Sequence, residues 1–165
     1  MKKILIIVLT LSVFMVQGQV DKNSELFITL KKQDSIFFER GFNQCDYEYL
    51  ENTIADDLKF YHDKSGFQDK ELFLENTRKY LCANPDKKPI RKLEEGSLVV
   101  FPLYNNGELY GVIQKGIHNF YIREKEKEDV QTGTAKFTSV WILKNDNWIL
   151  SEVLSYDHQA IKNNN

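Results

Sequence analysis

The residues of this chain best suited to chemistry are its three histidines, two of which stand beside an aspartate. His62 precedes Asp63, His158 follows Asp157, and His118 lies in a run of apolar and aromatic residues. A general base must reach the substrate proton and titrate near the working pH, which a histidine or a partly buried aspartate can do. Structural alternatives are also open. The first pair could close a turn, the second could fix the last strand to the first, and His118 could be a hydrogen-bonded core residue.

A metal site is a second chemistry open to the same side chains. Three imidazoles and two carboxylates could provide His₃ or His₂-carboxylate coordination if the first and last strands are neighbours. The sequence has no HxH or HExxH spacing, and it has no nucleotide-binding loop, nucleophile elbow or zinc signature. We therefore predict no metal and no other cofactor.

Two cysteines, Cys45 and Cys82, allow a single disulfide pairing. An exported chain permits such a bond, and two buried free thiols are the alternative. Closing a loop of this length would stabilise the fold by about 4 kcal/mol through the entropy of the unfolded chain. We predict that the bond forms.

Residues 1–18 have the pattern of a secretory signal peptide. A basic start precedes the apolar run Ile4 to Val16, and small Gly18 ends a cleavage motif. A membrane anchor is the alternative, but about 13 apolar residues fall short of the ~20 that a spanning helix needs. No cysteine follows the run, which argues against a lipid anchor. We expect a mature protein that begins near Gln19 and is secreted or periplasmic, with no membrane contact after cleavage.

The remaining residues, 19–165, have the length of one domain. The chain carries a net charge of −2, with acidic and basic residues interspersed. Nucleic-acid-binding proteins present a concentrated basic surface, which this distribution does not supply. We predict no nucleic-acid partner.

The first half of the mature chain predicts three amphipathic helices. Each is preceded by a residue whose side chain can cap the first turn: Ser24, Asp46 and Asp69. The expected helices cover residues 24–43, 46–54 and 70–82. Gly41 weakens the first helix near its end, and a short strand, Leu58 to His62, separates the second helix from the third.

Everything after Ile90 has the composition of β-strands. The expected strands cover residues 90–103, 108–123, 131–144 and 148–157. Turn residues join them, with Asn105-Asn106-Gly107 before the second strand and Asn145-Asp146-Asn147 before the last. Gly96, Gly111 and Gly116 are expected points of curvature, because glycine in a strand marks bulges and bends.

This order of elements predicts an α+β fold in which a strongly curved, mostly antiparallel sheet wraps around three N-terminal helices as a cone. A cone with an apolar interior and one open mouth is the usual form of a small-molecule site. Alternation along the strands groups the side chains by face. The candidate cavity residues are Phe60, Gln114, His118, Phe137, Trp141, Glu152, Tyr156 and His158. Packing in the core, or an outward orientation of Glu152, is the structural alternative.

Several segments of the chain resemble one known superfamily. They are residues 38–43 with Asp46, 60–66, 116–121, 135–138 and 154–159. Together they resemble the nuclear transport factor 2-like superfamily, which includes ketosteroid isomerase and the SnoaL-like cyclases. More narrowly, they are similar to an exported branch of uncharacterised small proteins. The resemblance covers residues 24–159 and implies the cone, also described as cystatin-like.

The resemblance implies several functions, since isomerases, dehydratases, cyclases and binding proteins share this fold. The leading hypothesis is an exported protein that binds a small apolar or polycyclic molecule. The first alternative is an isomerase, dehydratase or cyclase. In isomerase-like relatives a carboxylate base comes from the short first strand, which corresponds here to His62 and Asp63. A tyrosine could then polarise a carbonyl, as the oxyanion hole does in ketosteroid isomerase. The second alternative is a homodimeric interaction module that uses the outer sheet face.

Overall fold

The structure is a computed structural model that describes residues 18–161. Apart from Gly18, the predicted signal peptide therefore lies outside the described residues. The elements in chain order are α1 (Glu25–Ile36), η1 (Phe37–Asn43), α2 (Tyr47–Thr53), β1 (Ile54–His62), β2 (Gly66–Gln68), α3 (Lys70–Asn76), η2 (Thr77–Leu81), β3 (Lys87–Leu93), β4 (Val99–Asn105), β5 (Glu108–Glu124), β6 (Val130–Lys144) and β7 (Asn147–Ala160). Helices and strands thus follow the predicted α+β order.

The three helices begin at the predicted caps. The side chains of Ser24, Asp46 and Asp69 each accept a hydrogen bond from a backbone N–H in the first turn. The first and third helices end in wider π-helical turns, η1 and η2, a geometry found often at functional sites. Gly41 in η1 is required by packing, because a Cβ there would collide with the buried side chain of Leu50.

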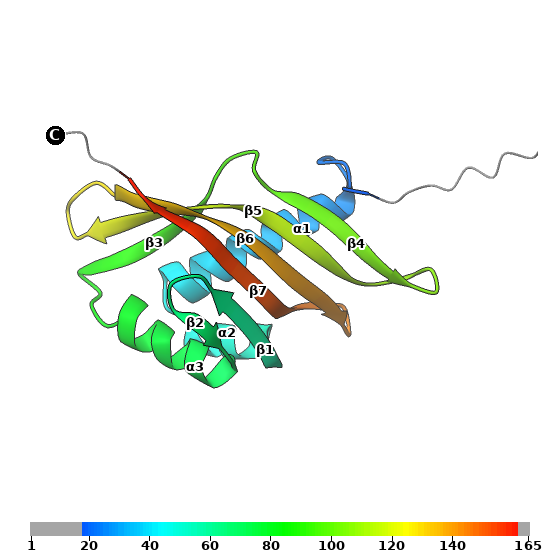
Figure 1. Cartoon of the computed structure of the whole chain (residues 1–165), viewed down its shortest axis with the longest axis horizontal. Coiled ribbons are helices and arrows are strands. Elements are labelled where there is room, and N and C mark those ends of the chain that lie inside the picture. The colour runs from blue at the N-terminus through cyan, green and yellow to red at the C-terminus, as the bar shows by residue number, and fades with distance from the viewer. Residues whose placement is uncertain (1–17, 162–165) are drawn as a thin grey trace, which may run out of the picture.

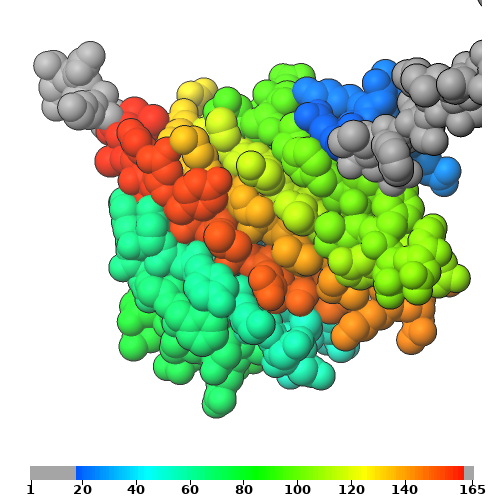
Figure 2. All heavy atoms as spheres, turned by 45° about the vertical axis from the view of Figure 1, so that its right-hand side comes forward, coloured from blue at the N-terminus to red at the C-terminus, as the bar shows by residue number. Residues whose placement is uncertain are grey.

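The sheet is open and curved, with strand order β2-β1-β7-β6-β5-β3, and β4 pairs with β5 beside β3. All neighbours are antiparallel except β1 and β7, which run parallel. Figure 1 shows α1 crossing behind β4, β5 and β6, whereas α2 and α3 lie near β1 and β2. Figure 2 shows β7, in red and orange, crossing one face of the molecule beside β6 and β5. The predicted cone of strands around three helices is confirmed.

Both hairpin turns follow their predicted chemistry. Asn106 and Gly107 have φ values of 51° and 85°, and Asn145 and Asp146 have φ values of 48° and 61°. Positive φ at both central residues matches the right-handed twist of the flanking strands. These turns join β4 to β5 and β6 to β7.

Two predicted boundaries differ from the structure. The expected strand over residues 90–103 is two strands, β3 and β4, separated at Gly96 with φ 76°. Each pairs with a different half of the long β5, which takes up the bend of the sheet. The short strand β2 was not predicted. It pairs with the end of β1 directly after the turn that follows His62.

Two irregularities in β7 decide which of its side chains face inward. Leu150 pairs with Trp141 and Glu152 pairs with Val140, so one extra residue is inserted between them. A second shift lies between Tyr156 and Gln159, where Asp157 has φ 60°. Each insertion reverses the alternation of side chains along the strand. The inward residues of β7 are therefore Leu150, Val153, Ser155 and His158.

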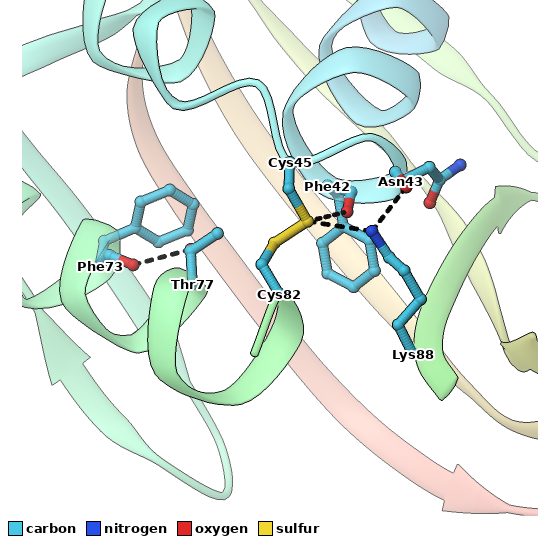
Figure 3. The surroundings of a disulfide bond; sticks show 7 residues. All are labelled: Phe42, Asn43, Cys45, Phe73, Thr77, Cys82 and Lys88. Carbon is cyan, nitrogen blue, oxygen red and sulfur yellow. Dashed lines mark hydrogen bonds between the residues drawn. A yellow bond between two sulfur atoms is a disulfide. The ribbon is translucent and has the colours of Figure 1, made fainter. Parts of the chain in front are cut away.

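Cys45 and Cys82 are joined in a disulfide. Figure 3 shows the bond between the loop that follows η1 and the end of η2, above the ring of Phe42. The ammonium group of Lys88 on β3 donates to the carbonyl of Asn43 at 2.7 Å and approaches the sulfur of Cys45 at 2.9 Å. The bond thus ties two helical segments together beside the sheet. Within residues 18–161, no helix combines the length and apolar character needed to cross a membrane.

Candidate functional site

A cavity of about 430 Å³ lies between the concave face of the sheet and the helical segments. Most of its lining is apolar and includes Phe37, Phe42, Leu58, Phe73, Leu150 and Val153. The polar lining includes all three histidines of the chain and Ser155. Small-molecule sites have this composition, in which a mostly apolar pocket carries a few placed polar groups.

The first polar group of the cavity is His118, which belongs to a fully buried network with Asp34 and Arg91. The guanidinium of Arg91 donates to both carboxylate oxygens of Asp34, at 2.7 and 3.0 Å. Its Nε donates to Nδ1 of His118 at 2.7 Å. We call these three residues the buried network. Burial raises the pKa of the Asp34 carboxyl, although the charge and hydrogen bonds of Arg91 act in the opposite direction.

The partner of His118 fixes its protonation state. Nδ1 accepts from a guanidinium, so the ring proton must lie on Nε2. Burial, followed by the nearby charge of Arg91, lowers the pKa of His118 well below its ordinary value. The ring stacks on Phe137 with a centroid distance of 4.2 Å and contacts Phe38 and Phe120. His118 therefore presents a neutral N–H donor to the cavity.

The second polar group is a cluster at the rim of the cavity, formed by His62, Asp63 and His158. Because β1 and β7 are parallel neighbours, the ends of both strands meet here. Asp63 accepts from the backbone N–H of His158 at 3.1 Å and lies 2.5 Å from Nδ1 of the same residue. The two imidazoles stack with a centroid distance of 4.3 Å. We call these three residues the rim cluster.

His62 is held as a donor and is poorly placed as a base. Its Nδ1 accepts from the backbone N–H groups of Lys64 and Ser65, at 3.1 and 3.2 Å. The neutral ring therefore carries its proton on Nε2, and no lone pair is left for proton abstraction. Burial, followed by the nearby charge of His158, lowers the pKa of His62. The hypothesis that His62 acts as the general base does not fit these hydrogen bonds.

His158 has the opposite arrangement. Its Nδ1 carries the proton that Asp63 accepts, so its Nε2 lone pair remains available. Burial alone would raise the pKa of Asp63, but the hydrogen bonds from the backbone and ring of His158 outweigh it and lower the pKa. Nε2 of His158 lies 3.4 Å from the hydroxyl oxygen of Ser155. The base of this site, if a base is needed, is therefore His158, oriented by Asp63.

The rim cluster also bears on the metal hypothesis. One donor atom from each of its residues falls within 4.8 Å of the others. A metal-bound imidazole, however, normally keeps a proton on its other nitrogen and donates it to an acceptor. In His62 that nitrogen faces two N–H donors. As they stand, the three side chains do not fit a shared metal ion.

The predicted cavity residues divide into three groups. Phe60, His62, His118, Trp141 and His158 line the cavity. Gln114, Phe137 and Asp63 lie behind that lining. Gln114 accepts from the indole N–H of Trp141 and donates to the carbonyl of Leu30, and Phe137 supports the ring of His118.

Glu152 and Tyr156, the third group, do not line the cavity. For Glu152 the structure has the outward orientation that was the alternative, and for Tyr156 the predicted face of β7 is wrong. The insertion after Leu150 turns both side chains to the outer face, where Glu152 lies 3.5 Å from Lys59. Asp157 also differs from the structural alternative that gave it a role in joining the last strand to the first. It pairs with Lys136 on β6, whereas its neighbour His158 makes the contact with Asp63, the residue that follows β1.

Sequence reasoning missed Asp34, Arg91 and Ser155. Asp34 lies four residues after Leu30 on the buried face of α1, and its side chain is 2% exposed. A charged residue on an apolar helix face is a signal, because a buried charge needs a partner. The side chain of Arg91 lies on the inner face of β3, but that face could not be assigned without knowing where the strand begins and ends. Ser155 was not among the predicted cavity residues, because an unbroken alternation from Leu150 puts it on the opposite face and the insertion in β7 was not foreseen.

A second hollow of about 610 Å³ lies between α1, β3 and the β3–β4 loop. Its lining carries both signs of charge, including Lys31, Glu39, Lys92 and Arg123. Lys92 and Arg123 both pair with Asp129, and Glu39 accepts from Asn43. Lys92, Arg123 and Glu39 thus already have partners, so the apolar cavity with its three histidines is the better candidate for a ligand site.

Several solved structures superpose on this chain over most of their length. ActVI-ORFA from Streptomyces coelicolor superposes with a TM-score of 0.66 at 10% identity, over 82% of this chain and 98% of that one. An NTF2-like protein from Cytophaga hutchinsonii gives 0.56 at 15% identity, over 84% and 99%. The chain has the nuclear transport factor 2-like fold. A cystatin-like protein of unknown function from Nostoc punctiforme gives 0.58 at 14% identity, over 84% and 94%.

The nuclear transport factor 2-like fold is the fold that the resemblance in the sequence implied. No protein-family model matches the chain, and no curated protein matches it significantly. At identities this low, the shared fold carries no activity from one protein to another. The function must therefore be argued from the cavity and its histidines.

Proposed function

We propose that the protein binds a small, largely apolar molecule that carries a hydrogen-bond acceptor such as a carbonyl. The observation that carries this proposal is the cavity of about 430 Å³ with neutral His118 at its wall. That volume lies in the ~300–1,000 Å³ range of ligand pockets. His118 and His62 offer N–H donors, and His158 offers a lone pair, so the polar end suits a ligand with a carbonyl or a hydroxyl group.

Titration of prodan, a naphthalene that carries a ketone, tests this proposal directly. Its emission shifts to the blue in an apolar site and responds to hydrogen bonding at the ketone. We expect saturable binding with a blue shift. His118→Leu, which has no N–H group to donate to the ketone, should weaken affinity about five- to tenfold, equivalent to about 1 kcal/mol.

A matched pair of substitutions separates the cavity from the rest of the sheet. Val153→Phe adds a ring inside the cavity, and we expect it to abolish prodan binding. Ile113→Phe adds a ring on β5 at a partly exposed position between buried Val112 and Gln114, and it should leave binding unchanged. Equal binding by the two variants, with both shown to be folded, or absence of saturable binding in the unaltered protein would refute the proposal.

We also infer export. The basic start and the apolar run of residues 4–16 support it, and so does a disulfide of the kind that persists in oxidising compartments. Expression of the full chain with N-terminal sequencing of the product tests this. We expect a mature N-terminus near Gln19 and a disulfide-bonded protein outside the cytoplasm.

A second candidate, self-association through the outer sheet face, is favoured by one exposed row. Phe67, Tyr61 and Leu154 are neighbours on β2, β1 and β7 and are 54%, 45% and 40% exposed. Contiguous apolar side chains of this kind mark protein contacts. Sedimentation velocity should show a dimer that Tyr61→Glu dissociates. A monomer at all concentrations would rule this candidate out.

A further inference from the structure

Three side chains at the rim of the cavity, those of Asp63, His158 and Ser155, form two successive polar contacts. Asp63 lies 2.5 Å from Nδ1 of His158, and Nε2 of His158 lies 3.4 Å from the hydroxyl oxygen of Ser155. Ser155 and His158 both line the cavity, whereas Asp63 stands behind His158. A nucleophile, a base and a residue that orients the base form the constellation of serine acyl transfer. It is recognised by geometry and roles, and the order in the sequence does not matter.

We propose that Ser155, His158 and Asp63 form an acyl-transfer site that hydrolyses small apolar esters. This inference rests on the proposed function, because the ester must first enter the same cavity. The apolar lining suits an acyl chain or an aromatic alcohol. Acidic or strongly charged esters would be excluded, because their charge would lose its hydration without gaining a partner.

The backbone explains why these three side chains meet. The insertion after Leu150 turns Ser155 inward, and positive φ at Asp157 brings His158 to the same side. The backbone N–H of His158 donates to Asp63 at 3.1 Å, and the backbone N–H of Asp63 donates to the carbonyl of Ser155 at 3.1 Å. One hydrogen bond between backbone atoms and one from a backbone N–H to the Asp63 carboxylate therefore fix the three residues relative to one another.

The chemical step follows from these positions. Nε2 of His158 removes the proton of Ser155, and the hydroxyl oxygen forms a bond to the ester carbonyl carbon while the carbonyl π electrons move to its oxygen. When this tetrahedral species collapses, the bond to the alkoxy oxygen breaks and the His158 imidazolium protonates the departing alcohol. Water, activated by His158 in the same way, then cleaves the acyl-serine and releases the acid.

The negative oxygen of the tetrahedral species needs hydrogen-bond donors. His118 and His62 both carry their proton on Nε2, because each Nδ1 accepts from a fixed donor. Both residues line the same cavity as Ser155. The ring of Phe120 lies beside both His118 and His158, with centroid distances of 5.6 and 5.8 Å, so donor and base are on one side of the cavity. Donors held in place before reaction stabilise developing charge.

A hexylphosphonate ester with a para-nitrophenolate leaving group tests the nucleophile. Attack by an activated serine releases the coloured phenolate and leaves the phosphonate attached to the protein. We expect one equivalent of phenolate and, by peptide mass spectrometry, a single modified residue, Ser155. Ser155→Ala should lose the labelling, whereas Ser151→Ala, four residues earlier in β7 and outside the cavity lining, should label at the original rate.

Asp63→Asn tests the orienting carboxylate. The amide keeps a similar shape but can turn its N–H₂ toward His158 and favour the wrong tautomer, so labelling should slow by at least about tenfold. Prodan affinity and the thermal midpoint serve as controls. A residue with a purely structural role would change the midpoint along with the rate, whereas a positioning residue changes the rate alone.

The outcomes separate this inference from the binding proposal. If the unaltered protein binds prodan but is not labelled, or is labelled at a residue other than Ser155, the acyl-transfer site is refuted and the binding proposal stands. If it is labelled at Ser155 without binding prodan, the cavity admits an ester and the acyl-transfer site stands, whereas the proposed binding of a ketone is refuted. If it does neither, both proposals are refuted. Labelling of Ser155→Ala at the original rate would also refute the inference.

Discussion

His118 and His158 face the same cavity with opposite hydrogen-bonding character. At His118, the guanidinium of Arg91 donates to Nδ1, so Nε2 carries the proton. At His158, the carboxylate of Asp63 accepts from Nδ1, so Nε2 carries the lone pair. The chemistry of each imidazole is thus set by the residue behind it. A count of histidines in the sequence gives no such information.

The two settings also differ in exposure. In the buried network, the side chains of Asp34 and Arg91 are each 2% exposed. In the rim cluster, the side chains of Asp63 and His158 are 32% and 13% exposed. Water can replace a lost partner at the rim but not in the core. Substitutions should therefore affect the stability of the fold at the first site and the function at the second.

The largest effect is expected from Arg91→Leu. This change leaves Asp34 buried without its partner, so the free energy of unfolding should fall by about 3–5 kcal/mol. Urea denaturation measures the change. The control is Arg123→Leu, whose guanidinium pairs with Asp129 at an exposed site and should change stability by less than about 1 kcal/mol. Equal effects of the two substitutions would contradict the distinction between buried and exposed charged residues.

The next effect is a dependence of stability on pH. His118 has a pKa well below its ordinary value of 6.5 in the folded protein. Between the folded pKa and about pH 6.5, the unfolded chain binds more protons, so stability is complete above pH 6.5 and decreases as the pH falls. The slope is about 1.4 kcal/mol per pH unit for one histidine. Urea denaturation at several pH values should show a flatter slope in His118→Gln, and an unchanged slope would contradict the assignment.

The smallest effect is a difference in tautomer without a large change in stability. Nitrogen NMR of the imidazole rings at neutral pH should place the proton of His118 and His62 on Nε2 and that of His158 on Nδ1. Asp63→Asn should change the tautomer of His158, should leave the proton of His118 and His62 on Nε2, and should destabilise the protein less than Arg91→Leu does. If all three rings had the same tautomer, the contrast between donor and acceptor would be lost.

The sequence was sufficient for the fold and only partly so for the site. The caps Ser24, Asp46 and Asp69 and both hairpin turns depend on local chemistry, which the chain displays directly. Glu152 and Tyr156 were placed on the wrong face because alternation was carried through β7 without a break. The insertion after Leu150 has no glycine or proline to mark it. Its position is set by the curvature of the whole sheet.

The disulfide has a consequence for the cavity that it borders. Cys45 follows η1 and Cys82 follows η2, and both of these π-helical segments contribute to the cavity wall. Before oxidation, no covalent bond holds the two segments at their distance. A newly made chain in a reducing compartment would therefore have a looser chamber than the oxidised protein. If the chain is exported as we propose, capture of the proposed ligand would be coupled in this way to the formation of the disulfide.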